Sequence, residues 1–273
     1  MRHRIFAALA GLLAASGAAA QVADRAGNRM EPLDVVRAVS AEEAGTRSAL
    51  HCTAARDLCL EARREGEEGP WLLWVHDALP ADTAAEPTRR IPLPESGETY
   101  GDEVAIWPHL VRDAAGATIV GAEHLQRTGF SGGGAGETSL RLFALPDPGP
   151  GAATEPRVLL ALPYGYSAMI RACFSEEDMA QRSGACHDEL EFGASLLLDP
   201  ATETGPPAFL YAAHARTFPR GALAEEDRRT LAPADLVWES DPACSYRRRF
   251  AADGDGGYAP DTPLPECDRY RIP

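Results

Sequence analysis

Lysine is absent from this chain, so its 26 basic residues are all arginine. The absence excludes any mechanism that needs a Schiff-base lysine or the lysine of a phosphate-binding loop. Long apolar runs are absent as well, because no stretch reaches the roughly 20 consecutive apolar residues of a membrane-spanning helix. We therefore expect no membrane span and no nucleotide-loop chemistry.

Positive charge is scarce beside negative charge. The chain carries 41 acidic residues and a net charge of −15 at pH 7. A surface of this sign repels a phosphate backbone, and the short cluster Arg247–Arg249 does not offset it. We therefore expect no nucleic-acid partner, whereas cationic partners or divalent metal ions suit the charge.

The first twenty residues have the pattern of a secretory signal peptide. Arg2 and Arg4 precede an apolar run, residues 5–15, and Ala18-Ala19-Ala20 supplies a small-residue cleavage site. The pattern predicts a leader over residues 1–20 and a soluble product that is periplasmic or secreted. Such compartments are oxidising, so cysteines exported there form disulfides.

The six cysteines lie close together in pairs along the sequence. Short loops close at a low entropic cost, which favours pairing each cysteine with its nearest partner. We predict three structural disulfides, Cys52–Cys59, Cys173–Cys186 and Cys244–Cys267. No Cys-x-x-Cys spacing indicates a redox pair or a zinc site.

Short apolar runs bounded by glycine, proline and acidic turns recur along the chain and are typical of strands. We expect an all-β, mainly antiparallel protein with short strands, hairpins and one or two short helices. One helix should follow Ser175 and end at Gly184, and a second turn is expected within 223–229. The spacing of the runs leaves a β-sandwich and a small β-propeller both open.

The domain organisation expected from composition is simple. Residues 21–47 are polar with scattered small residues and are expected to form a flexible N-terminal arm. Residues 48–273 are expected to form a single β domain held by the disulfides, since this length suits one large all-β domain.

Two fragments resemble the outline of a trypsin-like serine protease. These are His51-Cys52 and the Gly-x-Ser-Gly-Gly run 129–133, and the resemblance implies His51 as the general base and Ser131 as the nucleophile. Phe130 stands where that family has an acid, and more than half of the chain follows Ser131. A glycine-rich hairpin loop is the alternative interpretation of residues 129–136 and the one we favour.

Three aspartates in the run DGDGGYAPD are the best metal candidates. Asp253, Asp255 and Asp261 occupy positions 1, 3 and 9 of a would-be calcium loop. Gly257, Tyr258 and Leu264 stand where such a loop needs an acid, a glycine and a bidentate glutamate. A hairpin turn is therefore the default interpretation, with calcium as the possible cofactor and no other cofactor indicated.

These patterns favour a non-catalytic binding or envelope-accessory protein over an enzyme, because no catalytic motif is complete. The partner expected is a glycan, a peptide or an envelope protein. The alternative is an extracytoplasmic hydrolase that uses Ser131 with a histidine, or an acid pair such as Asp102 and Glu103.

Overall fold

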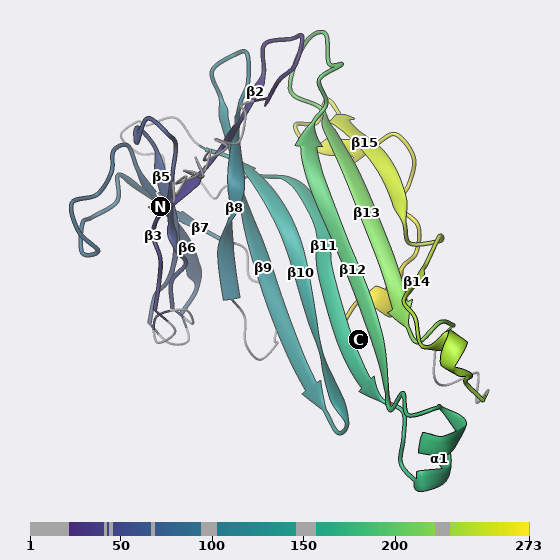
Figure 1. The fold of residues 1–273 in the computed structure, drawn as a ribbon. Coiled ribbons are helices and arrows are strands. Elements are labelled where there is room, and N and C mark those ends of the chain that lie inside the picture. The colour runs from purple at the N-terminus through teal and green to yellow at the C-terminus, as the bar shows by residue number, and fades with distance from the viewer. Residues whose placement is uncertain are drawn as a thin grey trace, which may run out of the picture.

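The computed structural model describes residues 22–40, 43, 46–66, 69–93, 103–145, 157–221 and 230–272, so the expected leader lies outside the described residues. Within these ranges the chain forms sixteen strands, one α-helix and two 3-10 helices. Neighbouring strands pair antiparallel throughout, as in β9 against β10 and β12 against β13. The predicted all-β, antiparallel class is confirmed (Figure 1).

Eleven strands form a large sheet. Its order is β1-β2-β8-β9-β10-β11-β12-β13-β15-β16, and β14 pairs with β13. The strands are β1 (Val22–Ala23), β2 (Arg29–Pro32), β8 (Glu103–Arg112), β9 (Thr118–Phe130), β10 (Gly133–Ala144), β11 (Val158–Arg171), β12 (His187–Leu198), β13 (Phe209–Phe218), β14 (Glu239–Ser240), β15 (Tyr246–Ala252) and β16 (Tyr258–Pro260).

Five strands form a small sheet in the order in which they occur along the chain. They are β3 (Asp34–Arg37), β4 (Leu50–Cys52), β5 (Cys59–Arg64), β6 (Trp71–His76) and β7 (Arg89–Pro92). Leu73 and Val75 of this sheet pack with Val120 and Phe143 of the large sheet in one buried core. Two packed sheets correspond to the sandwich alternative, and the propeller alternative does not describe this arrangement.

The central strands are longer than the short strands expected. The six strands from β8 to β13 contain 10 to 14 residues each. Glycine and proline within them were expected to end strands, but the sheet absorbs them as irregularities in register, for example near Pro108 on β8 and near Pro163 on β11. A β-bulge keeps a strand in the sheet where an ideal ladder would stop.

The register of β11 shifts around Tyr164, and there the large sheet divides. β11 pairs with β12 only from Gly165 to Arg171, so its first half stays with β10 alone. Side chains of this first half, such as Leu162, share a core with Leu196 and Tyr211 of β12 and β13. Tyr211 also donates a 2.6 Å hydrogen bond to the carbonyl of Pro163 across this core. Over residues 158–164, before the pairing with β12 begins, β11 and β10 therefore face β12 and β13 as a separate layer.

Residues 22–40, which lie within the segment expected to be a flexible arm, contain strands of both sheets. β2 pairs with β8 of the large sheet, and β3 pairs with β4 of the small sheet. Before β2, the Asn28 amide donates to the carbonyl of Gly205 and accepts from the backbone N–H of Ala114, at 3.1 and 2.9 Å. The segment is held because its edge backbone groups find partners in both sheets, which composition does not reveal.

The three predicted disulfides are confirmed. They join Cys52 to Cys59, Cys173 to Cys186 and Cys244 to Cys267. They indicate an oxidising, extracytoplasmic environment.

The helix predicted after Ser175 is α1 (Glu176–Gln181), and the Ser175 hydroxyl caps it by accepting from the N–H of Asp178. The two 3-10 helices are η1 (Pro233–Asp235) and η2 (Asp268–Tyr270). The second helical turn, expected within 223–229, lies outside the described residues. Among the helices of the described ranges, none is long and apolar enough to cross a membrane.

A buried ion-pair group fixes the small sheet internally. The carboxylate of Glu61 on β5 is fully buried, and its two oxygens lie 2.5 and 2.9 Å from the guanidinium groups of Arg47 and Arg63. The Arg63 guanidinium also lies over the ring of Trp74, 3.9 Å from its centroid. A buried carboxylate needs such partners to offset its desolvation.

Candidate functional site

One face of the large sheet is hollowed and lined by small side chains. Side chains alternate along a strand, so Gly193 and Ser195 of β12 point to the same side as Glu191. On β13 the neighbouring positions on that side are Ala212 and His214. We call this side of strands β10 to β13 the open face.

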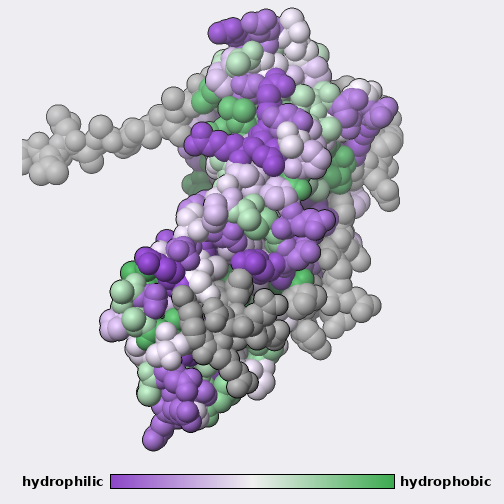
Figure 2. Space-filling view, turned by 90° about the vertical axis from the view of Figure 1, so that its right-hand side faces the viewer, coloured by the Kyte–Doolittle hydropathy of each residue, from purple (hydrophilic) through white to green (hydrophobic). Residues whose placement is uncertain are grey.

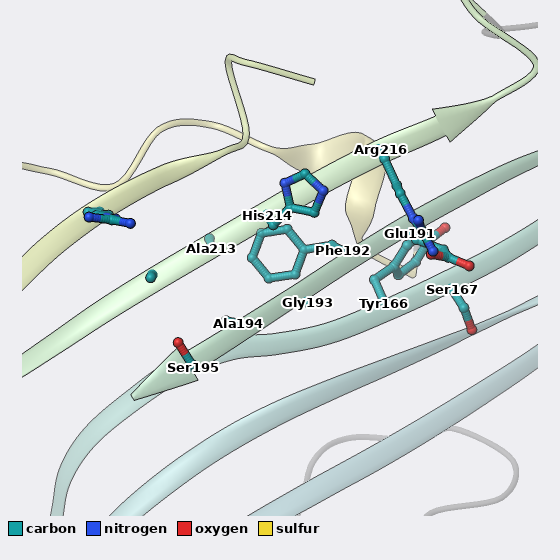
Figure 3. A pocket seen from close by; sticks show the side chains of 12 residues that line it. Tyr166, Ser167, Glu191, Phe192, Gly193, Ala194, Ser195, Ala213, His214 and Arg216 are labelled. Atoms are coloured by element: carbon teal, nitrogen blue, oxygen red, sulfur yellow. The ribbon is translucent and has the colours of Figure 1, made fainter. Parts of the chain in front are cut away.

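The larger hollow on the open face has a volume of about 740 Å³ and is shown in Figure 3. A second hollow of about 540 Å³ adjoins it and shares Ser167 and Glu191 with it. Together they cross the strands as an elongated depression. The larger hollow is lined by Tyr166, Ser167, Glu191, Phe192, Gly193, Ala194, Ser195, Ala212, Ala213, His214, Arg216 and Arg247.

Charged groups stand around this depression in a defined arrangement. Arg216 donates a 2.6 Å hydrogen bond to the Glu191 carboxylate, toward which it points in Figure 3. The ring of Trp238 lies beneath the same guanidinium, 4.4 Å from it. Arg247 and His214 are exposed and make no ion pair with any described residue. They remain available to a ligand that supplies hydrogen-bond acceptors.

The right-hand side of the molecule in Figure 1 carries β15 with its three successive arginines. Seen from that side, the described surface is largely hydrophilic, with smaller apolar patches between the polar groups (Figure 2). Arg249 of this strand is paired with Asp199, at 2.7 Å. The surface near β15 is therefore suited to polar contacts.

A more enclosed cavity of about 280 Å³ lies where the small sheet meets strands β8, β9 and β10. We call it the edge cavity. It shares Leu125 with the smaller hollow, and the ion pair between Glu103 and Arg127 links the two linings. The edge cavity is lined by Val39, Arg47, Ser48, Ala49, His51, Glu103, Val104, Ala105, Glu123, Leu125 and Thr138.

Burial shifts two titratable groups in the edge cavity toward their neutral forms. It raises the pKa of the Glu123 carboxyl and lowers the pKa of His51. The Nδ1 atom of His51 is buried without a hydrogen-bond partner. A cavity with apolar walls, few polar groups and perturbed pKa values is the usual form of a ligand site.

No family model, curated protein sequence or solved structure matches this chain. What the site can do is therefore inferred from its residues alone.

The structure brings together only part of the predicted catalytic set. His51 and Glu103 both line the edge cavity, whereas Asp102 lies outside the described residues. Ser131 is exposed in the turn between β9 and β10, six strand positions beyond Leu125. At about 3.3 Å per residue this places Ser131 roughly 20 Å from the cavity. Ser131 and His51 therefore do not form a nucleophile–base pair. The run 129–136 does lie at a hairpin, but only Ser131 and Gly132 form its turn, and the other residues belong to β9 and β10.

Of the three aspartates proposed for calcium, Asp253 and Asp255 lie in the hairpin turn between β15 and β16, and Asp261 directly follows β16. The Asp253 carboxylate accepts from the backbone N–H groups of Asp255 and Gly257, at 2.9 Å each. These amides lower the pKa of Asp253. Asp261 accepts from the N–H of Arg249. Among the described residues no group of three or more histidine, cysteine, aspartate or glutamate side chains is placed to hold a metal ion.

Sequence reasoning missed Glu123, Thr138 and the open face. Glu123 follows the apolar start of strand β9, and a charged residue within such a run was a possible signal. Gly193, Ser195 and His214 belong to no motif. They become a site only because strand register places them side by side.

Proposed function

We propose that the protein is an exported, non-catalytic binding protein of the periplasm or the cell exterior, and that the open face is its binding surface. The observation that supports this most directly is the elongated depression, with a hollow of about 740 Å³ at its larger end. The disulfides agree with export, and so does the leader expected over residues 1–20.

The geometry favours a glycan over the other two expected partners. From Gly165 to Ile170, β11 pairs with β10 on one side and with β12 on the other, so this part of the depression offers a peptide no free strand edge to extend. The aromatic lining residues, Tyr166 and Phe192, are buried, and the exposed ones are polar or glycine, whereas the centre of a protein interface is usually apolar and aromatic. Serine hydroxyls, arginines and a glutamate suit the many hydroxyl groups of a sugar chain.

The pairing of Arg216 with Glu191 supports a recognition role. Each group fixes the orientation of the other, and Trp238 holds the guanidinium from one side. Polar groups held in this way lose little conformational entropy when a ligand binds. A preformed polar surface of this kind suits a binding protein with an extended, flexible ligand.

Filling the depression tests the proposal. A Cβ atom at Gly193 meets no heavy atom within 4 Å, so Gly193→Trp adds a large side chain to the hollow without disturbing the sheet. Gly129 is equally open and lies outside the residues lining the hollows, which makes Gly129→Trp the matched control. Binding is measured on an array of bacterial cell-wall glycans and neutral polysaccharides, followed by calorimetry.

We expect the wild type and Gly129→Trp to bind the same oligosaccharide, and Gly193→Trp to bind it at least tenfold more weakly. The proposal is wrong if no glycan binds to the wild type. It is also wrong if Gly193→Trp binds as tightly as the control.

A further inference from the structure

The charged groups of the edge cavity already have partners. Glu103 is paired with Arg127, and Arg47 is paired with Glu61 and with Glu43. The Ser48 hydroxyl accepts from the N–H of Ala62 and donates to a backbone carbonyl. None of these groups needs a ligand to complete its hydrogen bonds or to neutralise its charge.

Three polar side chains of the cavity are left without such partners. Glu123, His51 and Thr138 make no hydrogen bond or ion pair with any described residue. When the Glu123 carboxyl and the His51 imidazole are uncharged, each can both donate and accept a hydrogen bond, as the Thr138 hydroxyl does. Ligand groups that also do both match them best.

We propose that the edge cavity binds one uncharged sugar ring, the terminal residue of a glycan whose remaining residues lie along the open face. This inference rests on the proposed function, because the edge cavity continues the depression at Leu125. A hydroxyl group both donates and accepts, and adjacent hydroxyls on a ring can reach several of the three free side chains at once.

The size and walls of the cavity agree with a single ring. Its volume of about 280 Å³ lies just below the roughly 300–1,000 Å³ of sites that hold drug-sized ligands. Val39, Val104 and Leu125 supply apolar surface for the C–H groups of a sugar. While Glu123 is uncharged, a charged ligand gains no free partner of opposite charge here, because Glu103 and Arg47 are already paired.

The ionisation of Glu123 gives the site a pH dependence. Among described residues, the titratable and charged groups that face this carboxyl are His51 and Arg47 from the small-sheet side, Glu103 from β8 and Tyr164 from β11. Partial burial raises the pKa of Glu123, so the carboxyl is neutral well below that pKa and becomes a partly buried anion above it. Binding of a neutral ring weakens as the pH rises through this value, because the carboxyl can no longer donate.

The test uses the full oxidised mature protein and four neutral probes, glucose, galactose, mannose and N-acetylglucosamine, with glucuronate and glucosamine as charged analogues. Binding is followed by backbone amide NMR shifts near Thr138 and by calorimetry. At a pH below the pKa of Glu123, we expect at least one neutral sugar to bind, and both charged analogues to bind at least tenfold more weakly.

Variants of two of the three free side chains test whether the sugar binds in the edge cavity. Thr138→Val and Glu123→Leu should each lower the affinity for the neutral sugar at least tenfold. Glu123→Gln keeps a neutral hydrogen-bonding group, so it should bind within about threefold of the wild type and lose the weakening at high pH. Thermal melting shows whether each variant is folded, and Glu123→Gln provides the pH readout even if Glu123→Leu does not fold.

The inference is overturned if none of the four neutral sugars binds, if the charged analogues bind as well, or if the pH dependence persists in Glu123→Gln. Its failure is distinguishable from failure of the proposed function. Suppose an oligosaccharide binds the wild type, and its affinity falls in Gly193→Trp but not in Thr138→Val. The edge cavity is then not part of the binding site, whereas the open face still is.

Discussion

Replacing His124 by leucine should make the protein more resistant to acid. His124 lies on β9 and is 2% exposed, and neither of its ring nitrogens has a hydrogen-bond partner. Burial, together with the charge of Arg141, lowers its pKa from 6.5 to about 4. The imidazole therefore stays neutral in the folded protein at a pH where the unfolded chain binds a proton.

The magnitude follows from the difference between the two pKa values. Between pH 6.5 and about pH 4 the unfolded state binds more protons at this position, so the free energy of unfolding falls as the pH falls. Each pKa unit corresponds to about 1.4 kcal/mol, which makes the loss from His124 about 3 kcal/mol across this window. Below pH 4 both states are protonated and the loss grows no further.

The assay is urea unfolding of the oxidised protein at pH 7 and pH 4. We expect His124→Leu to lose about 3 kcal/mol less than the wild type between these values. At pH 7 it should be at least as stable, because leucine removes two buried polar atoms without partners. The exposed His214 provides the control, and His214→Gln should change the stability by less than about 0.5 kcal/mol at either pH. Equal losses in wild type and His124→Leu, within about 1 kcal/mol, refute the reasoning.

Two further predictions concern the small sheet and the disulfides. Glu61→Gln should lower the free energy of unfolding by about 3 kcal/mol, because it leaves two largely buried arginines without their carboxylate. Arg25→Ala, which breaks an exposed pair with Glu203, should lower it by less than about 1 kcal/mol, and similar urea midpoints for the two variants contradict this account. Replacing each cysteine pair by serines should cost more for longer loops, about 2.4, 2.9 and 3.4 kcal/mol for separations of 7, 13 and 23 residues. Calorimetric melting measures this order, and the reverse order is the contrary result. The three pairs are Cys52–Cys59, Cys173–Cys186 and Cys244–Cys267.

Local signals in the sequence were sufficient for the fold class, the disulfides and α1. Short apolar runs specify strands, neighbouring cysteines close short loops, and Ser175 caps the turn that follows it. Each of these features depends on residues close together in the chain. The sequence alone therefore contained the information that decides them.

Strand lengths and the candidate site depended on contacts between distant residues. Gly165 lies inside strand β11, because β10 on one side and β12 on the other keep it in the sheet. Glu123 and His51 are 72 positions apart, and only the packing of the two sheets brings them to one cavity. His51 and Glu103 were selected for other reasons, and no pattern in the sequence pointed to Glu123 as their neighbour.

The contacts of Asn28 set an order on the folding of the chain. This side chain joins its own hairpin to Ala114 and to Gly205, which lie 86 and 177 residues away. Each disulfide, in contrast, joins cysteines at most 23 residues apart. Each disulfide can therefore form as soon as its own short segment is in place, whereas the hairpin around Asn28 depends on the distant loop that contains Gly205. The residues around Asn28 are therefore expected to be among the last to reach their final partners.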